Sequence, residues 1–80
     1  MSQNESSLEF YAERKRVADR LRDARKARNL SQQQLAALAD TDRTFISNIE
    51  SMKVNPSILT LFRLCDVLGI EPAWLLSNDA

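Results

Sequence analysis

The sequence is poor in the residues on which most catalytic sites depend. Its 80 residues include no histidine, one glycine and one cysteine. Cys65 therefore has no histidine to act as its base, and a single glycine cannot form a glycine-rich phosphate loop. The sequence also has no cluster of metal-ligating residues. We predict that the chain is not an enzyme and that it binds no metal, cofactor or small-molecule ligand.

Long apolar runs and a signal sequence are also missing. No apolar stretch approaches the roughly 18 residues that a membrane-spanning helix needs. The N-terminus, Met1 to Glu5, is polar and acidic, unlike a signal peptide. A lone cysteine cannot form a disulfide within the chain. We therefore predict a cytoplasmic protein without membrane association, in which Cys65 is a buried structural thiol.

Charge of one sign does not dominate, because 11 basic residues balance 11 acidic ones. This balance argues against a nucleic-acid partner that is bound through charge alone. Eight of the 11 basic residues lie between positions 14 and 28, where Asp19 and Asp23 are spaced to form ion pairs along a helix. Non-specific nucleic-acid binding is therefore expected to be weak, and base contacts and dimerisation are expected to supply most of the affinity.

Length and composition favour one compact helical domain. The apolar fraction is 44%, there are only two prolines, and no segment has the alternating pattern of a strand. The predicted fold is all-α, a five-helix bundle over residues 14–76. It is preceded by an N-terminal extension, residues 1–13, and followed by a polar tail, residues 77–80. A core of this size is modest, so part of the stability is expected from self-association.

The first predicted helix covers residues 14–28 and ends near Asn29. Its inward stripe recurs at steps of three and four residues and consists of Val17, Leu21 and Ala24. Upstream, Ser6 and Glu9 match a capping box. Either the helix extends back to residue 8, or the two aromatic residues before it, Phe10 and Tyr11, pack separately or on a partner.

The second predicted helix, residues 32–39, begins at a capping box made by Ser31 and Gln34. Its buried side is expected to consist of Leu35, Ala36, Leu38 and Ala39. At Asp40 the chain turns a corner that often requires a positive φ. Glycine is usual at such a corner, and aspartate is one of the few tolerated substitutes.

The third predicted helix covers residues 42–51 and is capped by Thr41 or Asp42. Ile46 and Ile49 point inward, which leaves four polar side chains mostly outside: Arg43, Thr44, Ser47 and Asn48. A short helix with a polar outer face, joined to its predecessor by a tight corner, suits the major groove of DNA.

The exposed residue types of this helix match the edges of bases. Arg43 can donate two hydrogen bonds to guanine, Asn48 can pair with adenine, and Thr44 offers a methyl group to thymine. For Phe45 we favour packing at the edge of the core over contact with the sugar–phosphate backbone. The alternative for Arg43 is a surface ion pair, worth at most about 1 kcal/mol, with one of its acidic neighbours, Asp42 and Glu50.

The fourth predicted helix, residues 58–68, follows the turn at Pro56, is capped by Ser57 and ends at Gly69. A fifth begins near Pro72 and runs to residue 76. Eight of the 11 positions in the fourth helix are apolar, more than one buried face needs. The surplus is expected to be exposed in a monomer and to form a dimer interface of Leu59, Phe62, and Leu75 or Leu76. The alternative is a central helix that the chain itself covers.

Several segments resemble the phage-repressor (Cro/C1-type, XRE) helix-turn-helix family: Ser31-Gln32-Gln33-Gln34-Leu35-Ala36, Arg43-Thr44-Phe45-Ile46-Ser47-Asn48-Ile49-Glu50, Asn55-Pro56-Ser57, and Leu64-Cys65-Asp66-Val67-Leu68-Gly69-Ile70 followed by Trp74-Leu75-Leu76. The similarity covers residues 14–76, and residues 42–47 are most similar to controller proteins of restriction–modification systems. The resemblance implies a lambda-repressor-like DNA-binding domain in which the second and third helices form the motif. It also implies dimers through the last two helices, bound to a pseudo-palindromic operator.

The resemblance assigns site residues as well. Gln32 and Gln33 open the second helix, where the family contacts the DNA backbone, and Lys53 lies in a loop that commonly holds phosphate. The base-contacting positions are Arg43, Thr44, Ser47 and Asn48. Met52 stands where a glycine often follows the recognition helix. Because a positive φ would cost a methionine about 1 kcal/mol or more, we expect the helix exit to differ locally.

These observations predict a sequence-specific transcriptional regulator. It binds double-stranded DNA as a homodimer, with the helix over residues 42–51 in the major groove. The alternative, supported by the zero net charge, is a protein-interaction module that keeps the fold, such as an antitoxin or adaptor. Salt-dependent binding to DNA duplexes distinguishes the two functions.

Overall fold

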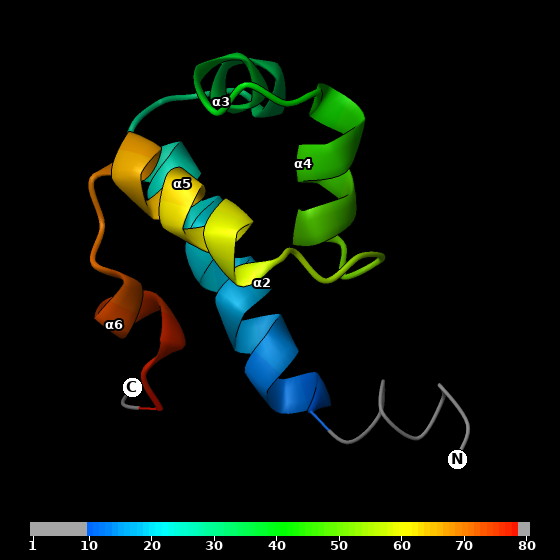
Figure 1. Ribbon diagram of the computed structural model, residues 1–80, viewed down its shortest axis with the longest axis vertical. Helices are drawn as coiled ribbons and strands as arrows, with labels where there is room; N and C mark the ends of the chain where they lie inside the picture. Colours follow the sequence, from blue (N-terminus) through cyan, green and yellow to red (C-terminus); the bar gives the residue numbers. More distant parts are fainter. Residues whose placement is uncertain (1–9, 79–80) are drawn as a thin grey trace.

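The computed structural model describes residues 10–78, which form five α-helices and contain no strand (Figure 1). The helices are α2 (Tyr11–Ala27), α3 (Gln32–Leu38), α4 (Arg43–Glu50), α5 (Ile58–Leu68) and α6 (Pro72–Leu76). The predicted all-α, five-helix fold is confirmed, although α2 begins before the expected residue 14. The capping box predicted at Ser6 and Glu9 lies outside the described residues. None of the described helices is long and apolar enough to cross a membrane.

α2 is the helix against which two others, α4 and α6, pack. Of the remaining helices, α3 packs on α4, and α5 contacts α6. In Figure 1, α3 and α4 meet at a corner on one side of the molecule, whereas α6 lies on the other side. The two helices of the corner are therefore positioned by α2 as well as by each other.

Side-chain caps fix where three of the helices begin. Ser31 Oγ accepts a hydrogen bond from the Gln34 backbone N–H, and Gln34 Oε1 accepts one from the Ser31 N–H, so the predicted capping box is present. Asp42, rather than Thr41, caps α4. Ser57 caps α5 as predicted. These caps satisfy backbone donors that a helix leaves unpaired in its first turn.

Four helices end in the same way, with one residue in the left-handed conformation: Asn29 (φ 57°), Asp40 (φ 57°), Met52 (φ 65°) and Gly69 (φ 67°). After each of them, the next backbone N–H donates to a carbonyl in the last helical turn, as in a Schellman motif. The expectation for Asp40 is confirmed. The expectation for Met52 is wrong, because hydrogen bonds from Met52 N to Ile49 O (3.1 Å) and from Lys53 N to Asn48 O (2.8 Å) close α4 in the ordinary way.

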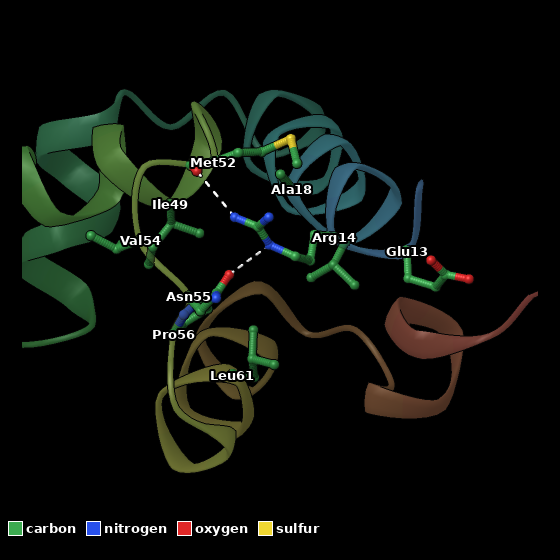
Figure 2. A pocket seen from close by; sticks show the side chains of 10 residues that line it. Glu13, Arg14, Ala18, Ile49, Met52, Val54, Asn55, Pro56 and Leu61 are labelled. Carbon is green, nitrogen blue, oxygen red and sulfur yellow. Dashed lines mark hydrogen bonds between the residues drawn. The ribbon is translucent and has the colours of Figure 1, made fainter. Parts of the chain in front are cut away.

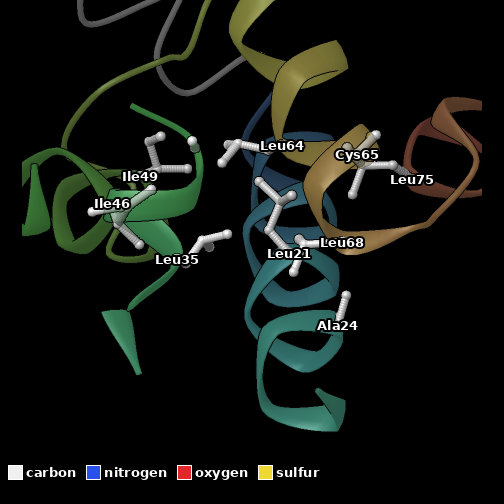
Figure 3. Close-up of a cluster of buried hydrophobic side chains, with 11 residues drawn as sticks. Leu21, Ala24, Leu35, Ile46, Ile49, Leu64, Cys65, Leu68 and Leu75 are labelled. Carbon is white, nitrogen blue, oxygen red and sulfur yellow. The ribbon is translucent and has the colours of Figure 1, made fainter. Parts of the chain in front are cut away.

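The core is built by side chains from all five helices, which converge in Figure 3. Its largest fully buried side chains are Leu35, Ile46, Leu64, Leu68, Leu75 and Cys65. The inward stripe predicted for α2 is confirmed, with Leu21 and Ala24 buried and Val17 partly buried. Burial raises the pKa of the Cys65 thiol, and the Glu71 carboxylate acts in the same direction. Cys65 is thus a buried thiol, as expected.

Two predictions of burial are wrong. Leu38 is 60% exposed, because the buried face of α3 is centred on Leu35, Ala36 and Ala39. At about 100° per residue, Ala39 falls between the other two, whereas Leu38 falls beyond Leu35. Leu75, expected at an exposed interface, is 0% exposed, since the short α6 turns it toward α2 and α5.

Candidate nucleic-acid interface

The outer face of α4 carries the four predicted base-contacting residues. Arg43 and Thr44 are exposed, Ser47 and Asn48 are half-buried, and the isoleucines behind them, Ile46 and Ile49, are buried. Phe45 packs against the core, so the favoured packing role is confirmed. The structure thus places the four side chains on one polar face that a rigid apolar face supports.

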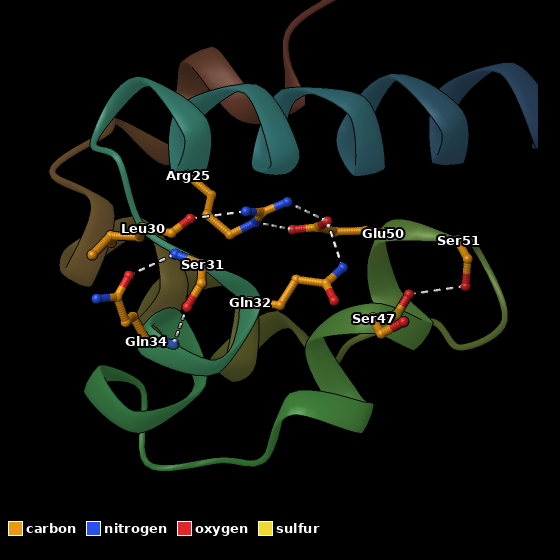
Figure 4. A network of polar contacts seen from close by, with 8 residues as sticks. All are labelled: Arg25, Leu30, Ser31, Gln32, Gln34, Ser47, Glu50 and Ser51. Atoms are coloured by element: carbon orange, nitrogen blue, oxygen red, sulfur yellow. Dashed lines mark hydrogen bonds and ion pairs between the residues drawn. The ribbon is translucent and has the colours of Figure 1, made fainter.

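A buried ion pair joins α2 to the end of α4. Arg25 Nε lies 2.7 Å from Glu50 Oε2, and Arg25 Nη2 donates to Glu50 Oε1 at 3.0 Å, which makes the pair bidentate (Figure 4). The side chains are 10% and 6% exposed. Glu50 is therefore engaged with Arg25, and among residues 10–78 no ion pair includes Arg43.

Our sequence analysis missed this pair, although a signal for it exists. Arg25 follows Leu21 by four residues and Glu50 follows Ile46 by four, so both charges continue apolar stripes. Opposite charges at inward positions of two helices indicate a buried ion pair, because neither charge is tolerated there alone.

The two glutamines that open α3 have different environments. Gln32 is half-buried, and its Nε2 donates to Glu50 Oε1 at 3.1 Å. Gln33 is exposed. Arg25 also donates from Nη1 to the Leu30 carbonyl at 2.8 Å, which fixes the turn before α3. The start of α3 and the end of α4 are thus held by the same network.

The loop after α4 is held by a second arginine. Arg14 Nε donates to Asn55 Oδ1 at 2.8 Å, and its Nη2 donates to the Met52 carbonyl at 3.3 Å. Figure 2 shows these contacts across a pocket of about 270 Å³ between α2 and the loop. Lys53, predicted to contact phosphate, is exposed in this loop. The sequence did not reveal the role of Arg14, because its contacts are 38 and 41 residues away.

The basic run of α2 does not form one open patch. Lys15 and Arg22 both pair with Asp19, at 2.8 and 3.0 Å. The hydrogen bond and charge of Lys15 lower the pKa of Asp19, and Asp19 in turn raises the pKa of Lys15. Other members of the run contact the chain itself, namely Arg14, Arg20 and Arg25. The ion-pair interpretation of Asp19 is confirmed, and the run contributes less free charge than its sequence suggests.

Large apolar side chains are also exposed on α5 and α6. Leu59 is 72% exposed, Phe62 47% and Leu76 45%, and Ile58 adds to them at 53%. Leu75 is not part of this surface, because it fills the core. Arg20 holds α6 in place, since its Nη1 donates to the carbonyls of Trp74 (2.6 Å) and Ser77 (2.9 Å).

Comparison with protein families places most of the chain in one of them. Residues 21–75 match the helix-turn-helix family. An immunity repressor protein of Bacillus phage phi105 is 35% identical over 63 residues. That match covers 79% of this chain, which spans only 44% of the length of the repressor.

Two further relatives are named as control or controller proteins. The control protein C.MunI from Mycoplasma sp is 39% identical over 64 residues, covering 79% of this chain and 86% of that protein. The crystal structure of the restriction–modification controller protein C.AhdI from Aeromonas hydrophila is similar with a TM-score of 0.76 and 36% identity. The alignment covers 82% of this chain and 96% of C.AhdI.

Proposed function

The chain belongs to the helix-turn-helix family of DNA-binding transcriptional regulators, and we propose that it binds a pseudo-palindromic operator as a homodimer. In this proposal α4 is the recognition helix and lies in the major groove. The observation that carries it is the polar outer face of α4, whose C-terminal end is fixed by buried or half-buried contacts to α2. Such a rigid helix can present side chains to base edges without ordering them first.

Each polar residue of the corner has a proposed role. Arg43 donates to guanine, Asn48 pairs with adenine, and Thr44 contacts thymine or phosphate. Ser47 permits close approach of the backbone. The DNA backbone is contacted by Gln32, Gln33 and Lys53.

The dimer is proposed to form through the apolar surface of α5 and α6. Three residues of the predicted interface are exposed and available: Leu59, Phe62 and Leu76. Their burial against a second copy would remove apolar area from water, which stabilises association. Two recognition helices would then enter successive major grooves, about 34 Å apart.

Among helix-turn-helix regulators, we propose that this chain is a restriction–modification controller. The alignment covers 96% of C.AhdI and 86% of C.MunI, so the chain resembles these small proteins over nearly their whole length. The phage repressor, by contrast, is more than twice as long as the matched part.

In vitro selection of duplexes from a random pool tests the proposal most directly. We expect the native chain to enrich two inverted half-sites with centres about 34 Å apart. Sedimentation at tens of micromolar, with and without the selected duplex, should show a dimer. Only monomer under both conditions would contradict the dimer, and an asymmetric single site would contradict the pseudo-palindromic operator.

The alternative is a module that binds another protein, which the zero net charge favours. A titration of the chain against random and selected duplexes at several salt concentrations separates the two functions. A DNA-binding protein gives a measurable slope of affinity against salt, because it releases counterions from phosphate. Absence of salt-dependent binding to every duplex would favour the interaction module.

A further inference from the structure

We propose that Glu50 is a positioning residue for DNA binding: held by Arg25, its carboxylate fixes the side-chain amide of Gln32 at the start of α3. This inference rests on the DNA-binding function proposed above. Figure 4 shows the three side chains pointing toward one another from α4, α2 and α3.

The contacts form a chain from the interior to the surface. Arg25 binds both carboxylate oxygens of Glu50, at 2.7 and 3.0 Å. The Oε1 atom of that carboxylate also accepts a hydrogen bond from Gln32 Nε2 at 3.1 Å. Arg25 and Glu50 are buried, whereas Gln32 is half-buried. The half-buried side chain of Gln32 is thus held by an ion pair that is largely shielded from solvent.

The chemistry of the pair decides which way the amide faces. An ionised carboxylate accepts hydrogen bonds and donates none, so the NH₂ group of Gln32 must face Glu50. One N–H of that group and the Oε1 atom are left for other partners. A phosphate oxygen needs a donor, and an adenine edge needs a donor and an acceptor. The Gln32 amide, held by Glu50, can supply the donor that phosphate needs or the donor and acceptor that adenine needs.

The ion pair also removes an electrostatic obstacle. A carboxylate so close to a phosphate-contacting residue would repel DNA if it were uncompensated. Arg25 compensates the charge of Glu50 through two hydrogen bonds and binds the Leu30 carbonyl at 2.8 Å with a third. The Arg25 guanidinium therefore fixes both the turn before α3 and Glu50, the residue that orients the side chain of Gln32.

Gln33 provides a matched control within the chain. It has the same side chain, is the neighbour of Gln32 on α3, and is exposed. In the free protein, nuclear magnetic resonance should show a rigid side-chain amide for Gln32, with a strongly positive ¹⁵N–¹H nuclear Overhauser effect. The amide of Gln33 should be mobile. Equal mobility of the two amides would overturn the proposal, whether or not the chain binds DNA.

A double-mutant cycle in DNA affinity tests whether the contact between Glu50 and Gln32 contributes to DNA binding. The paired change Arg25→Met and Glu50→Leu replaces the ion pair with apolar side chains, a replacement that folded proteins often tolerate. In the native background, Gln32→Ala should weaken binding of the selected duplex about tenfold, as expected for loss of one hydrogen bond to a charged group. In the apolar background the same substitution should weaken it less than about twofold.

Gln33→Ala should cause the same loss in both backgrounds. All affinities are measured at one salt concentration and at a temperature where circular dichroism shows each variant folded. If the apolar pair does not fold, the comparison of the two amides in the native chain, free and with duplex, still decides the proposal. Addition of duplex should then shift the resonance of the Gln32 amide without mobilising it, and an unshifted Gln32 amide would overturn the proposal.

Failure of the inference and failure of the proposed function give different results. Equal losses for Gln32→Ala in both backgrounds, with binding intact, would overturn the positioning role alone. A rigid Gln32 amide in a chain that binds no duplex would overturn the DNA-binding function, and the DNA role of Glu50 with it.

Discussion

α4 and the α5–α6 pair contribute to the same core, but they present opposite chemistry to solvent. α4 buries Ile46 and Ile49 and exposes a polar face. The α5–α6 pair buries Leu64, Leu68 and Leu75 and still exposes large apolar side chains. A polar exposed face suits DNA, and an apolar one suits a second protein surface.

The two regions also combine apolar packing and hydrogen bonds in different proportions. α4 has three apolar residues, and directional contacts fix its C-terminal end: the Arg25–Glu50 pair at its last residue and Arg14 at the loop that follows. The α5–α6 pair contributes more buried apolar side chains to the core than α4 does, and hydrogen bonds from Arg20 fix α6 alone. The comparison teaches that hydrogen bonds, which are directional, contribute more to the placement of α4 than to that of α5.

The largest effect that tests this comparison is expected from Glu50→Ala. It leaves Arg25 as an uncompensated buried charge, which should lower the free energy of unfolding by about 3–5 kcal/mol. Chemical denaturation followed by circular dichroism measures it. Glu71→Ala is the matched control, because Glu71 is exposed and makes no capping hydrogen bond, so its effect should stay within about 0.5 kcal/mol. Similar small losses for both would show that α4 does not depend on the ion pair.

Adjacent leucines test the apolar side of the comparison. Leu75→Ala removes a fully buried side chain and should cost about 2–5 kcal/mol of unfolding free energy. Leu76→Ala, at 45% exposure, should change that free energy little and should instead raise the dissociation constant of the dimer. Denaturation at low protein concentration and sedimentation across a concentration series measure the two quantities. An unchanged dimer in Leu76→Ala would remove α6 from the proposed interface.

Local signals in the sequence account for the parts of the fold that were predicted. Side chains that cap their own helix, such as Ser31, Asp42 and Ser57, mark the starts of helices because their partners are within the next turn. The polar face of α4 followed from the spacing of Ile46 and Ile49 in the same way. Both signals need only a few neighbouring residues.

The errors have physical causes as well. α3 has seven residues and α6 has five, too few for periodicity to define a buried face, so Leu38 and Leu75 were misplaced. The Arg25–Glu50 pair joins residues 25 positions apart. Charged residues are usually exposed, so the inward position of each charge in its apolar stripe was not recognised. The contact of the pair with Gln32 depends on tertiary packing.

Base preference is the next test of the polar face, with a smaller expected effect. Arg43→Ala should relax preference at one base pair of each half-site, at a cost of about 1–3 kcal/mol for each contact. Lys53→Ala, the control, should weaken all sequences alike and reduce the slope of affinity against salt by about one ion. Competition binding with operator variants and a salt titration measure the two effects. An unchanged base preference in Arg43→Ala would assign base recognition to other residues of α4.

The smallest effect is expected at the residues that end α4 and α5 in the left-handed conformation. These residues are Met52 (φ 65°) and Gly69 (φ 67°), which have nearly the same φ but different side chains. The left-handed conformation costs a non-glycine residue about 1–2 kcal/mol, and glycine loses about 0.5–1 kcal/mol more backbone entropy on folding. Met52→Gly should therefore raise the free energy of unfolding by about 0.5–1 kcal/mol.

Gly69→Ala should have the opposite sign, since it places a Cβ at φ 67° and 3.0 Å from Arg28 Nη2. Denaturation of both variants under the same conditions compares them. Met52 also lines the pocket beside Arg14, so its side chain contributes some packing. If Met52→Gly is destabilising, that packing outweighs the backbone strain, and the exit of α4 depends on apolar contact as the α5–α6 pair does.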